Sequence, residues 1–132
     1  MQVLQYPCLQ DAAAATTADV YGNGANERLL SKVLAEKRNQ IFIATKFGFR
    51  LRNHQGTVFD GGESYVDASP QYIRQAVELS LKRLDIETID LYYAHRIDPT
   101  IPVEETVGTM AELVKEGKVR YLGLSECSAE SL

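Results

Sequence analysis

Several residue types and patterns are scarce in this chain, and each scarcity narrows the kind of protein it can be. The sequence has no tryptophan and two cysteines, Cys8 and Cys127, which show no metal-ligand spacing. We therefore expect two reduced thiols in a cytoplasmic protein and no metal site. Basic residues form no block and the formal net charge is −4, so nothing indicates nucleic acid as a partner.

Long apolar runs are also missing. No run approaches the roughly 18 residues of a membrane span, and the first residues lack the basic and apolar regions of a signal peptide, so we expect no membrane association. What is present is an ordinary globular balance, with 45% apolar and 24% charged residues in a chain of 132. This length suits one domain, but a closed eight-stranded barrel needs roughly 200 residues or more.

Strand and helix patterns alternate along most of the chain. Residues 1–15 show too little periodicity for a strong strand, and we expect them to be poorly ordered. The pattern then predicts helices at 26–37, 70–84 and 103–116, strands at 41–45, 89–94 and 119–124, and a long loop at 47–69. This order, weak β–α–β–α–β–α–β, predicts an α/β fold with a parallel sheet.

Two of these helices have a predicted inward face. In the first helix the apolar residues are Leu29, Leu30, Val33 and Leu34, and in the third they are Val103, Val107, Met110 and Val114.

Three polar side chains lie where predicted strands end. Tyr21 follows the weak first strand, Lys46 follows 41–45, and His95 follows 89–94. In a parallel α/β sheet the carboxyl ends of the strands meet at one edge, which carries the chemistry. A phenol, an ammonium group and an imidazole gathered there indicate proton transfer to a carbonyl oxygen. Each residue taken alone also fits a structural or surface position.

The motifs around these residues resemble those of the aldo-keto reductases, which are NADPH-dependent (β/α)8 barrels. The matching stretches are TADVYG at 17–22, ATKFG at 44–48, SLKRL at 80–84, DLYYAHR at 90–96 and ELVKEGKVRYLGLSE at 112–126. Several motifs in the same order and at matching spacing make the resemblance specific. It covers residues 17–132 and implies a partial TIM (β/α)8 barrel of about four β/α units, so that 1–132 form a single partial domain of this family.

The resemblance also implies a role for each site residue. Tyr21 would be the general acid, and Lys46 would stabilise its phenolate, because a free tyrosine is a weak acid at neutral pH. His95 would hydrogen-bond the substrate oxygen. Ser125 and Glu126 would bind the nicotinamide carboxamide of NADPH, although Ser125 also fits a turn cap and Glu126 a surface position. Phe47, Phe49 and Tyr92 are candidates for the wall of the carbonyl pocket.

Two departures from the family pattern bear on activity. The family has an aspartate five residues before its catalytic tyrosine, where this chain has Thr16. Because a hydroxyl carries no charge to pair with Lys46, we expect a severe loss of activity from this change. The resemblance also begins near the family's second barrel strand and stops after its fifth.

Two functional hypotheses follow. The first is an oxidoreductase that reduces small aldehydes or ketones with NADPH. The second is a catalytically inactive truncated member of the family, acting through association if at all. An open half-barrel exposes two sheet edges and an apolar inner face, so self-association through these edges is a further expectation.

Overall fold

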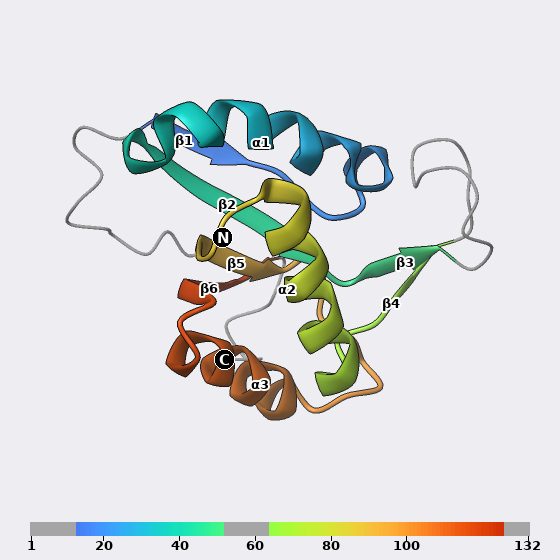
Figure 1. Cartoon of the computed structure of the whole chain (residues 1–132). Helices are drawn as coiled ribbons and strands as arrows, with labels where there is room; N and C mark the ends of the chain where they lie inside the picture. Colours follow the sequence, from blue (N-terminus) through green and yellow to red (C-terminus); the bar gives the residue numbers. More distant parts are fainter. Residues whose placement is uncertain (1–12, 52–63, 126–132) are drawn as a thin grey trace.

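The computed structural model describes residues 13–51 and 64–125, and its main sheet has four parallel strands (Figure 1). Their order is β1-β2-β5-β6, formed by Ala13–Thr16, Ile41–Phe47, Ile89–Ala94 and Val119–Leu124. The connecting helices are α1 (Ala25–Lys37), α2 (Pro70–Leu84) and α3 (Val103–Lys115), and all three lie on one face of the sheet (Figure 1). The predicted α/β order with a parallel sheet is thereby confirmed.

The weakly predicted first strand is present in the structure as β1, which has four residues. Ala13 pairs with Ile41 and Thr16 with Ala44 in a parallel ladder. The expectation of poor order for residues 1–15 is therefore wrong for the three alanines of β1, because the neighbouring β2 supplies the backbone partners that the local sequence does not reveal. Residues 1–12 lie outside the described residues.

The segment predicted as a loop at 47–69 contains two short strands. β3 (Phe49–Leu51) and β4 (Ser64–Val66) pair antiparallel and form a separate sheet beside the main one (Figure 1). Each has only three residues, too few for an alternating pattern to stand out in the sequence. Strand β2 also extends to Phe47, so Lys46 lies inside the strand and not after it.

Helix α2 has clear signals at both ends. The hydroxyl of Ser69 accepts a hydrogen bond from the backbone N–H of Tyr72 at 3.3 Å, and Pro70 takes the first helical position. The helix ends at Asp85 in the left-handed conformation, with φ 55°, where its N–H bonds the last turn. These caps explain why the predicted start at Pro70 and end at Leu84 agree with the structure.

The core lies between the sheet and the helices. Its fully buried residues include Ile43, Phe47, Ile73, Val77, Leu84, Ile89, Tyr92 and Leu113.

The predicted inward faces of α1 and α3 are only partly right. On α1, Leu34 is buried and Leu30 packs against the core, but Leu29 and Val33 are 62% and 47% exposed. On α3 the buried residues are Thr106, Thr109, Met110 and Leu113, whereas Val107 and Val114 are 38% and 37% exposed. The buried face of each helix therefore contains fewer of the predicted apolar residues than expected. Polar side chains take part of that face, Glu27 on α1 and Thr106 and Thr109 on α3.

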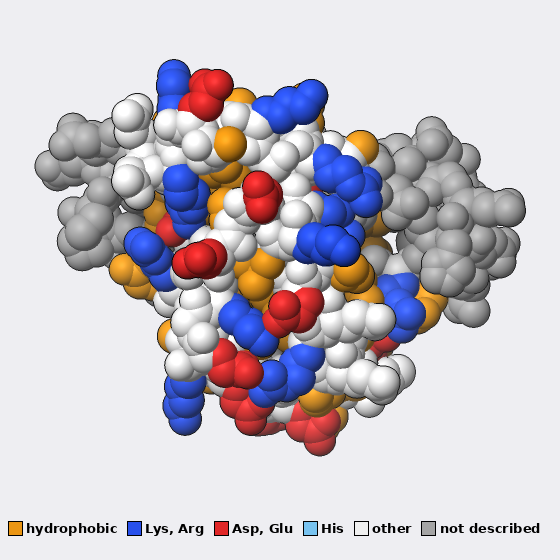
Figure 2. Space-filling view, viewed as in Figure 1, with side chains coloured by type: hydrophobic (Ala, Val, Ile, Leu, Met, Phe, Trp, Pro, Cys, Tyr) orange, Lys and Arg blue, Asp and Glu red, His pale blue; other side chains and the backbone are white. Residues whose placement is uncertain are grey.

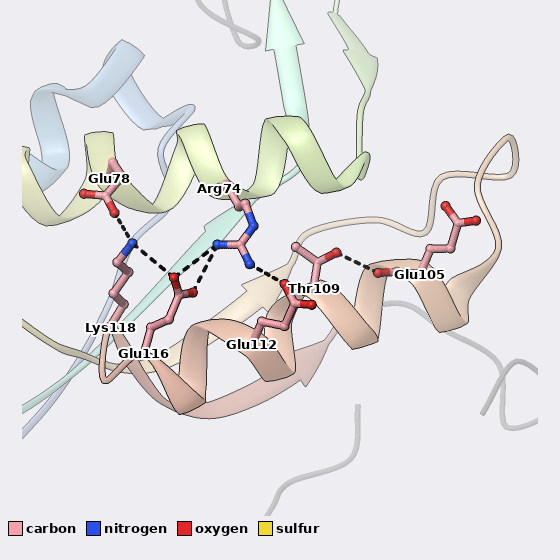
Figure 3. A network of polar contacts seen from close by, with 7 residues as sticks. All are labelled: Arg74, Glu78, Glu105, Thr109, Glu112, Glu116 and Lys118. Atoms are coloured by element: carbon pink, nitrogen blue, oxygen red, sulfur yellow. Dashed lines mark hydrogen bonds and ion pairs between the residues drawn. The ribbon is translucent and has the colours of Figure 1, made fainter.

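The outer surface of the helical layer carries both signs of charge, interspersed (Figure 2). Between α2 and α3 they form a network in which Arg74 pairs with Glu112 and Glu116 while Lys118 pairs with Glu78 (Figure 3). These pairs are solvent-exposed, and such pairs contribute little to stability. In the described part of the chain, no helix is long and apolar enough to cross a membrane.

A buried carboxylate joins α1, β2 and α2. Glu27 is completely buried; its Oε1 accepts hydrogen bonds from Thr45 at 2.6 Å and Ser80 at 2.8 Å, and its Oε2 pairs with Arg83 at 2.7 Å. The side chain of Arg83 in turn crosses Gly24, where an added Cβ would lie 2.6 Å from the arginine Cδ. Gly24 also has φ 91°, so it has two reasons to be glycine.

We predict that Glu27→Gln lowers the free energy of unfolding by about 3 kcal/mol, because it leaves the largely buried guanidinium of Arg83 without its counter-charge. Urea unfolding followed by circular dichroism measures the change. Glu36→Gln, on an exposed position of the same helix, is the matched control. Equal stability of the two variants would contradict the structural role of Glu27.

Candidate functional site

The residues predicted for the site lie at the carboxyl ends of the parallel strands. Backbone hydrogen bonds continue the sheet beyond the strands: Asp19 donates to Lys46 at 3.0 Å, His95 donates to Phe47 at 2.7 Å, and Ser125 donates to Ala94 at 3.0 Å. The ends of β2, β5 and β6 and the loop after β1 are therefore held in register at one edge.

Strand alternation sorts the side chains at this edge between two faces. On β2, Ile43, Thr45 and Phe47 are buried under the helices, so Lys46 projects from the opposite face. Lys46 pairs with Tyr93 on β5, which places Tyr93 and then His95 on that same face. Ser125 follows Tyr121 and Gly123 on β6 by the same alternation. The face opposite the helices thus carries the predicted site.

The phenol and the imidazole lie close together on this face. The rings of Tyr21 and His95 meet edge to face, with centroids 6.1 Å apart and an interplanar angle of 85°. Lys46 comes from β2, the strand between β1, whose loop carries Tyr21, and β5, which carries His95. Tyr21, Lys46, His95 and Ser125 are all half-buried. Four segments far apart in the sequence are thus brought to one edge.

Tyr21 sits in a short helical turn, η1 (Tyr21–Gly24), directly before α1. The N–H of Tyr21 donates to the carbonyl of Ala18 at 3.1 Å, and Thr17 hydrogen-bonds Asn26 through its side chain at 2.6 Å. This turn directs the chain from β1 toward the helical layer while leaving the tyrosine ring beside His95.

Of the three aromatic residues predicted for the pocket wall, only Phe49 lies at the site. Its ring centroid is 4.8 Å from that of His95. Phe47 and Tyr92 are completely buried on the helical side, where their rings pack 4.9 Å apart, so their assignment to the wall is wrong. Side chains alternate between the two faces of a strand, and Phe47 is one residue from Lys46 while Tyr92 is three residues from His95. This alternation alone places both rings on the face opposite the site.

The same alternation identifies a wall residue that the sequence analysis missed. Tyr93 lies on the open face beside Lys46, and its ring covers Gly123 so closely that an added Cβ there would be 2.3 Å from a ring carbon. Tyr93 and Phe49 therefore supply aromatic surface near His95, the first over Gly123 of β6 and the second against the imidazole ring.

Thr16 lies on the open face as well. It pairs with Ala44, two residues before Lys46 on β2, so it shares the face of the lysine. Thr16 is exposed. A carboxylate at this position would extend from the neighbouring strand on the side of the ammonium group.

Asp19 occupies the opposite side of the same turn. Its Oδ2 accepts a hydrogen bond from the hydroxyl of Tyr72 at 3.3 Å, and its Oδ1 is buried with no hydrogen-bond partner among the residues described. Burial, reinforced by the nearby charge of Glu27, raises the pKa of Asp19 to about 7 despite the opposing charge of Arg83. No role for Asp19 was predicted from the sequence; its acidic character beside an apolar strand was the available signal.

The hairpin next to the site is held by a second group of polar contacts. Arg50 pairs with Asp67 at 2.9 Å and lies over the rings of Tyr72 and Tyr65 at 4.7 and 5.7 Å. Burial alone would raise the pKa of Asp67, but hydrogen bonds from Ser69 and the Arg50 guanidinium outweigh it and lower the pKa. These contacts fix β3, and with it Phe49, against the start of α2.

Glu126, predicted to bind the cofactor together with Ser125, lies outside the described residues. In residues 13–51 and 64–125, no group of three or more histidine, cysteine, aspartate or glutamate side chains could hold a metal ion.

Comparison with known proteins identifies the family. The model of the aldo/keto reductase family matches residues 14–132. The chain is 46% identical to "Probable aldo-keto reductase 1" of Glycine max over 133 residues, which cover 100% of this chain and 36% of that protein. The chain belongs to the aldo/keto reductase family, as the sequence motifs predicted, and it spans about a third of the length of such relatives.

Solved structures give the same result for the fold. A glycerol dehydrogenase of Gluconobacter oxydans matches with a TM-score of 0.80 and 38% identity, over 89% of this chain and 35% of that one. An aldo-keto reductase of Klebsiella pneumoniae in complex with NADPH matches with a TM-score of 0.72 and 28% identity, over 90% of this chain and 36% of that one. The fold is a partial (β/α)8 barrel, as predicted.

We predict that Asp19 makes stability fall as the pH rises from about 4 to about 7. Its pKa is higher in the folded protein than the usual 3.8, so the folded state keeps a proton that the unfolded state has released, and the protonated form stabilises the fold. Asp19→Asn removes this dependence. The difference in unfolding free energy between variant and wild type should change by about 3 kcal/mol between pH 4.5 and 8 in urea titrations. A constant difference across this range would contradict the raised pKa.

Proposed function

We propose that Tyr21, Lys46 and His95 form the catalytic site of an oxidoreductase that reduces aldehydes or ketones to alcohols with NADPH. The observation that carries this proposal is the edge-to-face contact of Tyr21 with His95 at 6.1 Å, with Lys46 on the strand between their segments. The family of the chain and the position of the site at the strand carboxyl ends support it.

Each residue has one task in this reaction. Tyr21 donates a proton to the carbonyl oxygen as the carbonyl carbon is reduced. The ammonium group of Lys46 stabilises the tyrosinate that remains, since an adjacent positive charge favours the ionised phenol. His95 hydrogen-bonds the carbonyl oxygen and orients it toward Tyr21. The aromatic rings of Phe49, beside His95, and of Tyr93, beside Lys46, exclude water from the site.

NADPH supplies the hydride when bound. The hydroxyl of Ser125 can both donate to and accept from the nicotinamide carboxamide, and its place at the end of β6 on the site face suits that role. We assign Glu126 as its neighbour in this contact from the family motif. The complex of the Klebsiella pneumoniae relative with NADPH supports the choice of cofactor.

The catalytic role of Tyr21 is best tested in a chimera, because the chain spans about a third of its relatives. Residues 14–132 would replace the matching segment of the Glycine max relative. We predict that Tyr21→Phe in this chimera lowers kcat for an aldehyde at least about a hundredfold, since it removes the proton donor. Consumption of NADPH, followed by absorbance, measures the rate. Tyr65→Phe, which removes a hydroxyl from β4, is the control, and equal rates in the two variants would refute the assignment.

Thr16 stands where the family has an aspartate, and this difference gives a second prediction. In the same chimera, Thr16→Asp should raise kcat about tenfold or more, because it places a negative charge on the face and side of Lys46 and restores the ion pair that orders the ammonium group. Ala14→Asp, one step earlier on the same face of β1, is the matched control. A rate unchanged by Thr16→Asp would show that the threonine hydroxyl supports catalysis as well as a carboxylate at this position.

The second candidate is a non-catalytic role through association, the alternative that the sequence left open. Tyr121 is 42% exposed and stacks on Phe42 across the open face, with ring centroids 6.4 Å apart. An aromatic pair of this kind suits a contact with another copy of the chain. A dimer on size-exclusion chromatography that Tyr121→Lys dissociates would support this role, and a folded monomer would exclude it. The cytoplasmic location stays a prediction from cysteine usage.

A further inference from the structure

The turn that carries Tyr21 is held to the rest of the protein by backbone hydrogen bonds and by a side-chain hydrogen bond. Its backbone is held to β2, because the N–H of Thr17 donates to Ala44 at 2.9 Å and that of Asp19 donates to Lys46 at 3.0 Å. A side chain of the turn is also held to α2, because Asp19 accepts a hydrogen bond from the hydroxyl of Tyr72 at 3.3 Å.

Tyr72 is itself held in place by contacts of its backbone and of its ring. It lies in the first turn of α2, where its N–H is capped by Ser69, and its ring packs under the guanidinium of Arg50 at 4.7 Å. The hydrogen bond to Asp19 therefore links the Tyr21 turn to the capped end of a helix and to the hairpin beside the site.

Charged and titratable groups surround the Asp19 carboxyl on the helical side. They are Glu27 from α1, Tyr72 and Arg83 from α2, and Tyr92 from β5. Burial and the charge of Glu27 raise the pKa of Asp19 to about 7, so its neutral form is present near neutrality. A neutral carboxyl still accepts a hydrogen bond from Tyr72, and an asparagine side chain can do the same.

We propose that Asp19 is a positioning residue for Tyr21, which fixes the tyrosine ring against His95 by tying the intervening turn to Tyr72 on α2. The catalytic meaning of this role rests on the proposed function. Its structural content does not, because the contact between Tyr21 and His95 can be measured without substrate or cofactor.

The test uses the full 132-residue chain and NMR contacts between ring protons. In the wild type we expect a contact between Tyr21 and His95, whose rings meet edge to face. Asp19→Ala and Tyr72→Phe should each weaken it about threefold or more, since each removes one partner of the hydrogen bond. Asp19→Asn should preserve it. Tyr65→Phe, which removes a hydroxyl from β4 beside the same Arg50, should leave it unchanged.

The contact between Phe47 and Tyr92, with centroids 4.9 Å apart, reports that each variant remains folded. Tyr72→Phe keeps its ring and loses one oxygen, so it remains informative if Asp19→Ala fails to fold. A full Tyr21–His95 contact in Tyr72→Phe would overturn the proposal, as would a loss in Asp19→Asn equal to that of Asp19→Ala. Retained activity in the Tyr21→Phe chimera would overturn the proposed function alone and leave the Tyr21–His95 contact untouched, so the two failures are distinguishable.

Discussion

The ion pair between Glu27 and Arg83 is the interaction on which the arrangement of this protein depends. It is largely buried, and it is completed by hydrogen bonds from Thr45 and Ser80, so one carboxylate joins the first helix, the second strand and the second helix. Thr45 directly precedes Lys46, and Arg83 packs on Gly24 at the end of the turn that begins with Tyr21. The contacts on the helical side therefore set the positions of two candidate catalytic residues that project from the other side of the sheet.

This division between the two faces explains several features that look unrelated in the sequence. The helical side contains buried polar groups with defined partners, including Asp19 with Tyr72 and Asp90 with Arg38. Burial of these groups is costly unless they are hydrogen-bonded, so they specify one arrangement of helices on the sheet. The open face carries the half-buried side chains of Lys46, Tyr93 and His95. The stabilising contacts and the candidate catalytic side chains thus alternate along the same strands.

The parts of the fold with long periodic patterns could be predicted from sequence. Helix α2 has a strong N-cap at Ser69 and apolar residues at helical spacing, and its limits agree with the structure. β3 and β4 could not be predicted, because three residues are too short for alternation and their pairing is set by tertiary contacts. For the site, the motifs predicted that Tyr21, Lys46 and His95 meet at the carboxyl edge of the sheet, where they lie, although Lys46 belongs to β2 itself. Phe47 and Tyr92 were assigned to the wrong face. Asp19 was missed because its environment depends on α2, which lies about fifty residues further along the chain.

The most direct test of the central claim is a titration of the folded 132-residue chain with NADPH, followed by chemical shifts of the backbone and aromatic rings. If the open face is the nicotinamide site, saturable shifts should appear at Lys46, His95, Tyr93 and Ser125, all at the carboxyl ends of the strands. Residues of the helical surface, such as Arg74 and Lys118, should not move with the same saturation curve. Shifts confined to that surface, or none up to millimolar cofactor, would contradict the account.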